Sequence, residues 1–508
     1  GGLPLRRASG GLAGEQPRDG EEDDEGGLEA AAGDWREFRA RLVQLEQQEG
    51  AGAGEGAPSA SAEGWAYESP LIEQGAVLLS VPSNHFAINQ QYFHKNVIIL
   101  ISHSPIFTTG IILNRPTALS MRDLPRASGA GEAIDGIDDW NVWFGGDCQG
   151  LNDNTGGAGS EKYFVLHCLD RFAGKSETII SGMYSMQFED AKALVTSGEA
   201  DKDDFLLLVG YCGWGEGQLQ RELDAGDTWT MAAVDQRAVL GELREAQSAL
   251  RTRIQGAKEG QRFTASDVGD GLEMWERLYG QLGPAFAERL AEFKATRESA
   301  HTDEVLRRWI TRCLIPSRYN TGTPTTSEAR AALRPSTLNL LESGTLLRAS
   351  ATQWLLGKPA EHAKFDLNSF LPGQYFHKAV LVLVRDEDQG VEMVALLNGP
   401  VLSRGSQGTV LWGGPGGNVE LKVGVGEESI LVKGLTVLLP GTLDLLLNLG
   451  AFEKVVAADL DTVLRAPAED RWALAGGRIR TVADAEAAQL GDEQRRLWFR
   501  RFLGIEVA

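Results

Sequence analysis

Histidine and cysteine are scarce in this chain, which limits the metal and redox chemistry that it can carry. The 508 residues include seven histidines and four cysteines. Cys148, Cys168, Cys212 and Cys313 form no CxxC pair and show none of the close spacings that zinc sites use. We therefore expect no metal site and no cofactor, and we expect reduced thiols in an intracellular or organellar compartment.

Long apolar runs are also missing. A helix that crosses a bilayer needs about 20 apolar residues. The longest apolar stretches here, NVIILIS and KAVLVLV, have only the length of buried strands. The sequence therefore predicts no transmembrane segment, while peripheral association with a membrane stays open.

Positive charge is in short supply. The chain has 49 Lys and Arg against 71 Asp and Glu, a net charge of −22. Residues 1–60 hold 13 acidic and 6 basic side chains, a net of −7, so the remaining residues carry −15. A surface this negative repels phosphate backbones, and direct nucleic-acid binding is therefore disfavoured.

Residues 1–60 are predicted to form a disordered acidic tail that contains one short helix. Segments such as DGEEDDEGG bury too little apolar surface to offset the entropy lost on ordering. Within residues 34–48, Trp35, Phe38 and Leu42 recur at helical spacing. This amphipathic helix either docks on its own chain or binds a partner protein through these side chains.

An internal repeat is the most informative feature of the sequence. QYFHKNVIILI at 91–101 returns as QYFHKAVLVLV at 374–384, and four further blocks recur in the same order. Such self-similarity indicates a tandem duplication. We call residues 61–325 the first copy and residues 326–508 the second copy. The other blocks pair 71–81 with 340–350, 112–116 with 396–400, 142–147 with 410–415, and 179–183 with 431–435.

Each copy is predicted to be α+β, with a mixed sheet or barrel-like core and flanking helices. Short β-rich runs are bounded by Gly, Pro and Asn. No regular strand–helix alternation is present, which argues against a doubly wound sheet. Residues 235–315 are expected to be a helical insertion that the second copy lacks. We expect the two copies to pack together as an internal pseudo-dimer.

The stretch YCGWGEGQLQREL at 211–223 is the most distinctive motif. Its glycines permit tight turns and close backbone approach, and a helix that starts near Gln218 offers an anion site. The motif lacks the Lys and Ser/Thr of a phosphate-binding P-loop. It is interpreted either as a fold-closing turn with Trp214 in the core, or as a ligand pocket that uses Trp214 and Gln218.

Three further polar residues are candidates for the same pocket. ILNRP contains Asn114 and Arg115, and an arginine can hold a carboxylate or phosphate with two hydrogen bonds. FVLHCLD contains His167 next to Cys168. These two residues cannot act together as base and nucleophile, because neighbouring residues of a strand face opposite sides. Asp147 and Glu222 are the two candidate acid partners for His167. No complete catalytic set is present, and we assign no catalytic residue.

Other marked positions are interpreted as parts of the fold. His94 and His377 of the repeated QYFHK supply too few ligands for a metal. The paired glycines of FGGD and WGGP occur in both copies, which indicates a requirement of backbone geometry. The structural positions are Pro116, Gly145, Gly146, Gly213, Gly215, Trp229, Gly413 and Gly414.

The second copy serves as an internal control for these motifs. It has Gly399 where the first copy has Arg115. Across residues 449–477, where the tryptophan–glycine loop is expected, it contains no Gly-Trp-Gly, and Trp472 is expected to correspond to Trp229. The second copy therefore cannot share a function of the loop.

The motifs together resemble the YqgE/AlgH family. GAVLLSVP, YFHKNVIILISH, GIILNRP, FGGD, FVLHCLD and LLLVGYCGWGEGQLQRELDAGDTW carry the resemblance over about residues 71–283, and residues 340–508 carry it in degenerate form. The acidic leader, the 34–48 helix and the duplication resemble plant and algal members, which implies a plastid protein. The resemblance implies no established activity and no agreed ligand.

These features favour a non-catalytic binding, assembly or regulatory factor that acts through protein–protein contacts. We expect it in the chloroplast, in the stroma or at the stromal face of the thylakoid, with a multiprotein complex as partner. Two alternatives stay open. One is a hydrolase-like enzyme or small-anion-binding protein that uses the pocket of the first copy, and the other is a transcriptional regulator by family analogy.

Overall fold

The computed structural model divides the chain into two compact units, Gly1–Gly54 and Glu55–Ala508. In the first unit, residues 36–40 and 42–43 are helical, and the side chains of Phe38 and Leu42 are exposed. Trp35 lies outside the described residues. The structure describes residues 36–40, 42–43, 64–88, 90–124, 136–149, 151, 163–258, 261–319, 343–351, 374–386, 391–405, 408–423, 430–438, 443, 446–447, 451–456, 458–479 and 482–505.

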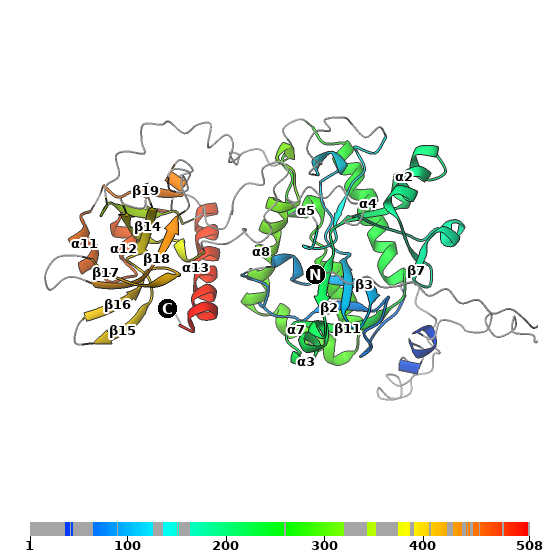
Figure 1. The fold of residues 1–508 in the computed structure, drawn as a ribbon, viewed down its shortest axis with the longest axis horizontal. Coiled ribbons are helices and arrows are strands. Elements are labelled where there is room, and N and C mark those ends of the chain that lie inside the picture. Colours follow the sequence, from blue (N-terminus) through cyan, green and yellow to red (C-terminus); the bar gives the residue numbers. More distant parts are fainter. Residues whose placement is uncertain are drawn as a thin grey trace, which may run out of the picture. The chain divides into compact units, whose positions relative to one another are not determined.

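Two sheets form the centre of the first copy (Figure 1). The described strands of one sheet lie in the order β1-β11-β2-β3-β4-β10, and those of the other in the order β5-β9-β6-β8-β7. All neighbours pair antiparallel except β5 and β9, which are parallel, so the fold is mixed α+β. The strands are β1 (Ala66–Glu68), β2 (Val77–Ser80), β3 (Val97–His103), β4 (Phe107–Ile112), β5 (Trp143–Phe144), β6 (Tyr163–His167), β7 (Glu177–Ile180), β8 (Met183–Met186), β9 (Leu206–Val209), β10 (Cys212–Gly215) and β11 (Trp229–Val234).

Alternate residues of the central strands enter two different apolar clusters. In β3, Ile98 and Leu100 belong to one cluster, and Val97 and Ile99 belong to the other. Side chains of a strand alternate between its two faces, so both faces of this sheet are buried. This explains why NVIILIS is apolar without interruption.

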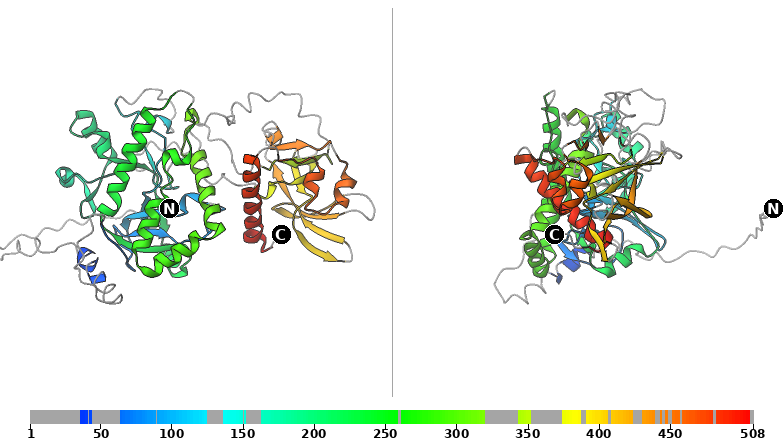
Figure 2. Two further views of the ribbon diagram at one scale, coloured as in Figure 1. Left: turned by 180° about the vertical axis from the view of Figure 1, so that it is seen from behind. Right: turned by 90° about the vertical axis from the view of Figure 1, so that its left-hand side faces the viewer.

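Helices enclose the strands of the first copy (Figures 1 and 2). FEDAKALVTSG forms a helix that ends at Gly198 with φ 77°, as the sequence predicts. No helix among the residues with described structure is long and apolar enough to cross a membrane. The helices are α2 (Phe188–Ser197), α3 (Gln218–Ala225), α4 (Arg237–Gln255), α5 (Ala265–Val268), α6 (Leu272–Gln281), α7 (Pro284–Lys294) and α8 (Arg297–Cys313).

The second copy has a sheet in which described strands follow the order β15-β16-β18-β14-β13-β12-β19, with β17 also paired to β18. Its β16–β18 pair is parallel, like β5–β9 of the first copy. The elements are β12 (Leu346–Ala349), β13 (Val380–Asp386), β14 (Val391–Leu396), β15 (Val401–Gly405), β16 (Gly408–Trp412), β17 (Gly416–Val423), β18 (Ile430–Leu438), β19 (Phe452–Lys454), α11 (Leu460–Arg465), α12 (Arg471–Leu474) and α13 (Val482–Leu503).

The repeated QYFHK forms the same local structure in both copies. QYF is a 3-10 turn, η3 (Gln91–Phe93) in the first copy and η12 (Gln374–Phe376) in the second. The lysine that follows has a positive φ in each case, 46° at Lys95 and 50° at Lys378. Such a φ is uncommon for a residue with a side chain, so surrounding contacts must hold it.

An ion-pair cluster provides those contacts, and we call it the His–Lys–Asp clamp. In the first copy, His94 Nε2 lies 2.7 Å from Asp303 Oδ1, and Lys95 Nζ lies 2.9 Å from the same carboxylate. Lys95 also donates to Glu276 at 3.0 Å. The clamp ties the buried turn after η3 to helix α8.

The second copy repeats the clamp with its own residues. His377 Nε2 lies 3.1 Å from Asp492 Oδ1, and Lys378 Nζ donates to Asp492 Oδ2 at 2.7 Å. Asp492 lies on α13, as Asp303 lies on α8. The Asp492 side chain is 44% exposed against 16% for Asp303, so the second clamp is closer to solvent.

Helices α8 and α13 are therefore counterparts. Residues 303–309, DEVLRRW, align with residues 492–498, DEQRRLW. The ring of Trp309 lies 5.4 Å from that of Tyr92, and the ring of Trp498 lies 4.9 Å from that of Tyr375. The prediction that the whole of 235–315 is absent from the second copy is wrong for α8. The match is hard to see in the sequence because only four of the seven positions are identical, three of them charged and one a tryptophan.

The expected correspondence of Trp472 with Trp229 is also wrong. Trp229 pairs with Ser80 in the sheet, and the residue that pairs with the equivalent Ala349 is Phe452. Trp472 instead donates its indole N–H to the Ala349 carbonyl at 2.7 Å. Trp275 of α6 donates in the same way to the Ser80 carbonyl at 3.0 Å. Strand register, which the sequence does not display, decides this assignment.

Loss of the first clamp should cost more stability than loss of the second. Asp303→Ala removes a partner of Lys95, whose side chain is 1% exposed. A buried charge that loses a partner typically costs about 3 kcal/mol. Asp492→Ala should cost about 1 kcal/mol, because exposed pairs contribute little. Urea unfolding of the two variants tests this, and equal losses would contradict it.

Stability should fall on acidification from pH 6.5 towards pH 4. Burial lowers the pKa of His94 to about 4 from its ordinary 6.5. The unfolded chain therefore takes up this proton first, and the stability present above pH 6.5 is lost as the pH falls through that range. Burial alone would raise the pKa of Asp303, but the hydrogen bond from His94 and the charge of Lys95 lower it overall. A lowered carboxyl pKa also makes the folded state less stable at acid pH, so Asp303 and His94 contribute in the same direction.

Thermal melts at several pH values measure this loss. His94→Gln removes the titrating ring while keeping a hydrogen-bonding side chain, so the slope of melting temperature against pH should become flatter between pH 6.5 and 4. An unchanged slope in this variant would exclude His94 as its source.

Candidate functional site

Asn114 and Arg115 lie together after β4, where both side chains bind backbone groups. Asn114 Oδ1 accepts from the Val97 N–H at 3.0 Å, and its Nδ2 donates to the carbonyls of Lys95 and Gly271 at 2.9 and 2.7 Å. Asn398 binds the equivalent backbone groups of the second copy. The asparagine therefore fixes the turn after the clamp in both copies.

The guanidinium of Arg115 is 0% exposed and donates only to carbonyl oxygens. Its acceptors include Tyr92 at 3.1 Å, Asp270 at 3.1 Å and His94. Burial lowers the pKa of Arg115 to about 9, with Asp270 and Asp303 opposing this effect. Its donors are thus occupied within the fold, and none of them faces a described cavity.

The second copy replaces this buried arginine from a different element. Gly399 stands in the position of Arg115, and a Cβ there would lie 1.9 Å from the Trp412 carbonyl oxygen. Arg495 of α13 donates instead to the Asn398 carbonyl at 2.9 Å, as Arg115 Nη1 does to the Asn114 carbonyl at 2.8 Å. Both copies therefore keep a guanidinium at this turn, which indicates a structural requirement.

His167 lies in a separate network. Its Nδ1 accepts from the Leu169 N–H at 3.2 Å, so its Nε2 donates to Ser176 Oγ at 2.8 Å. Ser176 Oγ in turn donates to the Phe172 carbonyl at 2.9 Å. Burial lowers the pKa of His167, which favours the neutral ring. As a donor to Ser176, His167 does not act as its base.

The distinctive loop closes around a single carboxylate. Trp214 Nε1 and Trp229 Nε1 both donate to Glu222 Oε2, at 3.0 and 2.8 Å, and Gln218 Nε2 donates to Glu222 Oε1 at 2.9 Å. Gln218 Oε1 accepts from the Gly215 N–H at 3.2 Å. We call Trp214, Gln218, Glu222 and Trp229 the Trp–Glu–Trp network. Glu222 pairs with these donors and not with His167.

Glycines permit the backbone approaches around this network. A Cβ on Gly145 would lie 2.3 Å from the Gly210 carbonyl oxygen, and one on Gly146 would lie 2.1 Å from the Tyr211 carbonyl carbon. In the second copy, a Cβ on Gly413 would lie 2.4 Å from the Gly434 carbonyl oxygen, and one on Gly414 would lie 2.6 Å from the Leu435 carbonyl carbon. The ring of Phe107 lies against Gly213. Pro116 is buried directly after Arg115.

The second copy does contain a counterpart of the loop, at an earlier position than expected. In the first copy β10 pairs with β4 so that Trp214 lies opposite Thr108. In the second, β18 pairs with β14 so that Leu438 lies opposite the equivalent residue, Glu392. The block 431–435 therefore matches 207–211, and the predicted pairing with 179–183 is corrected by the sheet register.

The carboxylate and both tryptophans of the Trp–Glu–Trp network are replaced by apolar residues in the second copy. Leu438 occupies the position of Trp214, and Phe452 occupies the position of Trp229. Leu443 is buried in the second copy as Leu219 is in the first, and with these two residues aligned, Leu446 corresponds to Glu222. Leu438, Leu443, Leu446 and Phe452 share one apolar cluster. Replacing every partner of a polar contact is nearly neutral, whereas removing one leaves the others unsatisfied.

The predicted ligand residues thus belong to three bonding networks, and ligand binding at them stays a prediction. The sequence indicated Glu222 only as a possible acid partner of His167 and did not single out Asp303 or Asp492. The repeated DE and tryptophan of α8 and α13 were the available signal for the two aspartates. Within the described parts of the chain, no group of three or more His, Cys, Asp or Glu side chains could hold a metal ion.

Glu222→Leu should destabilise the protein only while the two indoles are present. The change leaves two buried N–H donors unsatisfied, at about 1–3 kcal/mol each. In the W214L/W229F background, which copies the second copy, the same change should cost almost nothing. Urea unfolding of the four variants gives the coupling energy.

Glu216→Leu is the matched control, because Glu216 is exposed on the same loop. Its effect should stay within about 0.5 kcal/mol. Additive losses for Glu222→Leu in both backgrounds would contradict the assigned network.

Comparison with known proteins places residues 81–254 in an AlgH-like family model. A UPF0301 protein of Burkholderia mallei (strain SAVP1) is 30% identical over 149 residues, which cover 29% of this chain and 71% of that protein. A UPF0301 protein of Shewanella loihica is 28% identical over 159 residues, or 31% of this chain and 76% of that protein.

Two solved structures are similar to part of the chain. The solution structure of the AlgH protein from Pseudomonas aeruginosa matches with a TM-score of 0.26 and 21% identity, over 37% of this chain and 92% of that chain. A crystal structure of a protein from Corynebacterium diphtheriae matches with a TM-score of 0.24 and 17% identity, over 36% and 89%. On the evidence of its sequence relatives, this chain belongs to the AlgH-like, or UPF0301, family.

Proposed function

We propose that this protein is a non-catalytic binding, assembly or regulatory factor that acts through protein–protein contacts in the chloroplast. The observation that carries the proposal is that the polar side chains of the family motif form hydrogen bonds with other groups of the fold. Glu222 is bonded to two indoles and to Gln218, and Arg115 is bonded to backbone carbonyls. Because these side chains are already engaged in hydrogen bonds that hold the fold together, the motif is better suited to stabilising a rigid binding surface than to catalysing a reaction.

An exposed apolar patch adjoins the motif. Ile106 is 72% exposed and Phe107 is 43% exposed, at the turn between β3 and β4. Phe107 pairs with Gly215 across the strands, and its ring lies over Gly213. We call Ile106 and Phe107 the tip patch. Exposed apolar side chains that gather at one place support a protein contact there.

Charge and family resemblance support the rest of the proposal. The net charge of −22 disfavours contact with nucleic acid, so a transcriptional regulator is the weaker candidate. It also favours partners with a positive surface, because complementary charge speeds encounter. The location in the stroma or at the stromal face of the thylakoid rests on the resemblance to plant and algal members.

We further infer that the two copies pack as an internal pseudo-dimer through α8 and α13. His301 Nε2 of α8 lies 2.7 Å from Gln494 Oε1 of α13. Gln494 Nε2 also donates to the Ala87 carbonyl at 2.8 Å, and Gln374 Nε2 donates to the Ile88 carbonyl at 3.0 Å. These buried contacts join the counterpart helices and turns of the two copies.

Polar substitution of the tip patch should remove partner binding without unfolding the protein. Affinity purification from chloroplasts followed by mass spectrometry compares the wild type with Ile106→Ser/Phe107→Ser. The wild type should recover a defined partner, and the variant should recover it at least about tenfold less, a loss of roughly 1.4 kcal/mol.

Val456→Ser is the matched control, because Val456 is 90% exposed and lies in the second copy. It should recover the same partner as the wild type. Absence of any stable partner of the wild type would overturn the assembly proposal, and undiminished recovery by the double variant would exclude the tip patch.

A further inference from the structure

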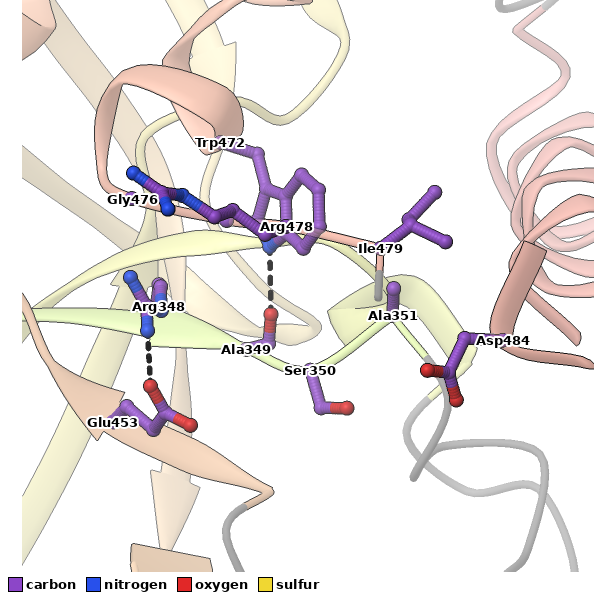
Figure 3. A pocket seen from close by; sticks show the side chains of 11 residues that line it. Arg348, Ala349, Ser350, Ala351, Glu453, Trp472, Gly476, Arg478, Ile479 and Asp484 are labelled. Carbon is purple, nitrogen blue, oxygen red and sulfur yellow. Dashed lines mark hydrogen bonds and ion pairs between the residues drawn. The ribbon is translucent and has the colours of Figure 1, made fainter. Parts of the chain in front are cut away.

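Two places that are covered in the first copy are open in the second. One is a hollow of about 190 Å³ beside α12 (Figure 3). In the first copy α6 continues past Trp275, and the ring of Tyr279 stacks on Trp275 with centroids 5.0 Å apart. In the second copy α12 ends at Leu474, directly after the turn that holds Trp472. The charged residues that line the hollow are Arg348, Glu453, Arg478 and Asp484. The other open place is one edge of strand β17.

Strand β17 is the counterpart of β6 in the first copy. It pairs antiparallel with β18, as β6 pairs with β9, and β18 and β9 each pair parallel with one further strand. Lys422 of β17 lies opposite Leu431, and Val165 of β6 lies opposite Leu207. Because Leu431 and Leu207 are equivalent, Lys422 occupies the position of Val165.

The outer edge of β6 is covered by another strand, whereas that of β17 is open. In the first copy β8 pairs with β6, and Met186 lies opposite Val165, which is fully buried. Residues 168–205, between β6 and β9, hold β7, β8 and α2, but only residues 424–429 separate β17 from β18. Among the strands that the structure describes, β17 pairs with β18 alone. An edge of this kind can add a strand from another chain.

The side chains along β17 differ between its two faces. Leu421 and Val423 pack in the apolar cluster on one face of the sheet. Glu420 and Lys422 alternate with them, so they point to the other face, where both are exposed. Val419 is 49% exposed at the start of this stretch. The edge therefore carries one charge of each sign, two residues apart, beside apolar side chains.

We propose that this edge pairs with the same edge of a second copy of this chain, as an antiparallel β17–β17 pair about a two-fold axis. An axis through Leu421 places Glu420 of each chain opposite Lys422 of the other. Opposite charges that face each other across strands are stabilising, and like charges are destabilising. An axis through Glu420 or Lys422 would instead set like charges opposite each other, so the charge pattern selects the first register.

The same register also pairs apolar side chains. It sets Val419 of one chain opposite Val423 of the other, and the sheet continues from one chain into the next. The net charge of −22 opposes this association at long range. Salt screens that repulsion, because the Debye length is about 8 Å at physiological ionic strength. The inference does not rest on the proposed function or on the tip patch.

Sedimentation velocity of the full chain at physiological ionic strength tests the proposal. Two short strands form a small interface, so the wild type should be monomeric at about 1 μM and largely dimeric at about 100 μM. Light scattering coupled to size-exclusion chromatography measures the mass of each species.

Charge reversals assign the contact to β17. Glu420→Lys or Lys422→Glu alone sets like charges opposite each other twice, and each should weaken dimerisation at least about tenfold. The double variant E420K/K422E exchanges the two charges and should dimerise like the wild type. An equimolar mixture of the two single variants should also form dimers, because one chain then carries two positive charges at the edge and the other two negative charges.

Lys454→Glu is the matched control, because Lys454 is exposed on β19, at another edge of the same sheet. It makes the same charge change as Lys422→Glu and should leave the dimer fraction unchanged. Melting temperatures verify that every variant is folded.

Three results would overturn the proposal. One is a wild type that stays monomeric at about 100 μM, the concentration at which even a small interface should form. The second is dimerisation that the single charge reversals leave unchanged. The third is failure of both the double variant and the mixture to restore dimers. Because these measurements involve no other protein, none of these results bears on the proposed assembly function.

Discussion

The buried contact between Lys95 and Asp303 is the constraint on which the first copy depends. A lysine side chain that is 1% exposed needs a partner for its charge, since an isolated buried charge is very costly. One partner, Asp303, lies on α8, 208 residues further along the chain, and the other, Glu276, lies on α6. Helix α8 must therefore return to the turn after η3, and the helices that precede it are laid against the sheet on the way. The second copy obeys the same constraint through Lys378 and Asp492.

The two copies satisfy their other polar requirements in different ways. In the first, a carboxylate accepts from two tryptophans, and Arg115 fills the turn. In the second, the carboxylate and both tryptophans give way together to Leu446, Leu438 and Phe452, while Arg495 supplies the guanidinium from another helix. Each change is coordinated because one buried partner cannot be removed without leaving the others unsatisfied. This coupling explains why the second copy differs strongly from the first in residue identity, although equivalent positions still meet one another in the fold.

Divergence has also given the copies different surfaces. The first copy buries its family motif and exposes the tip patch beside it. The second shortens the helix that would cover Trp472, and a hollow lined by both charge signs takes the place of a buried tyrosine.

The sequence by itself determined the α+β class, the repeat, the family and the positions of the central strands, because apolar periodicity, turn residues and local identity encode them. It also indicated that the paired glycines serve backbone geometry. Only the tertiary structure decided which residues meet. Glu222 with two tryptophans, Asp303 with QYFHK, and Trp472 with Trp275 as its counterpart all depend on strand register and on contacts between residues far apart in the chain. A single sequence carries no direct record of those contacts. Residue identity alone matched Trp229 with Trp472, which is 20 residues beyond its structural counterpart Phe452.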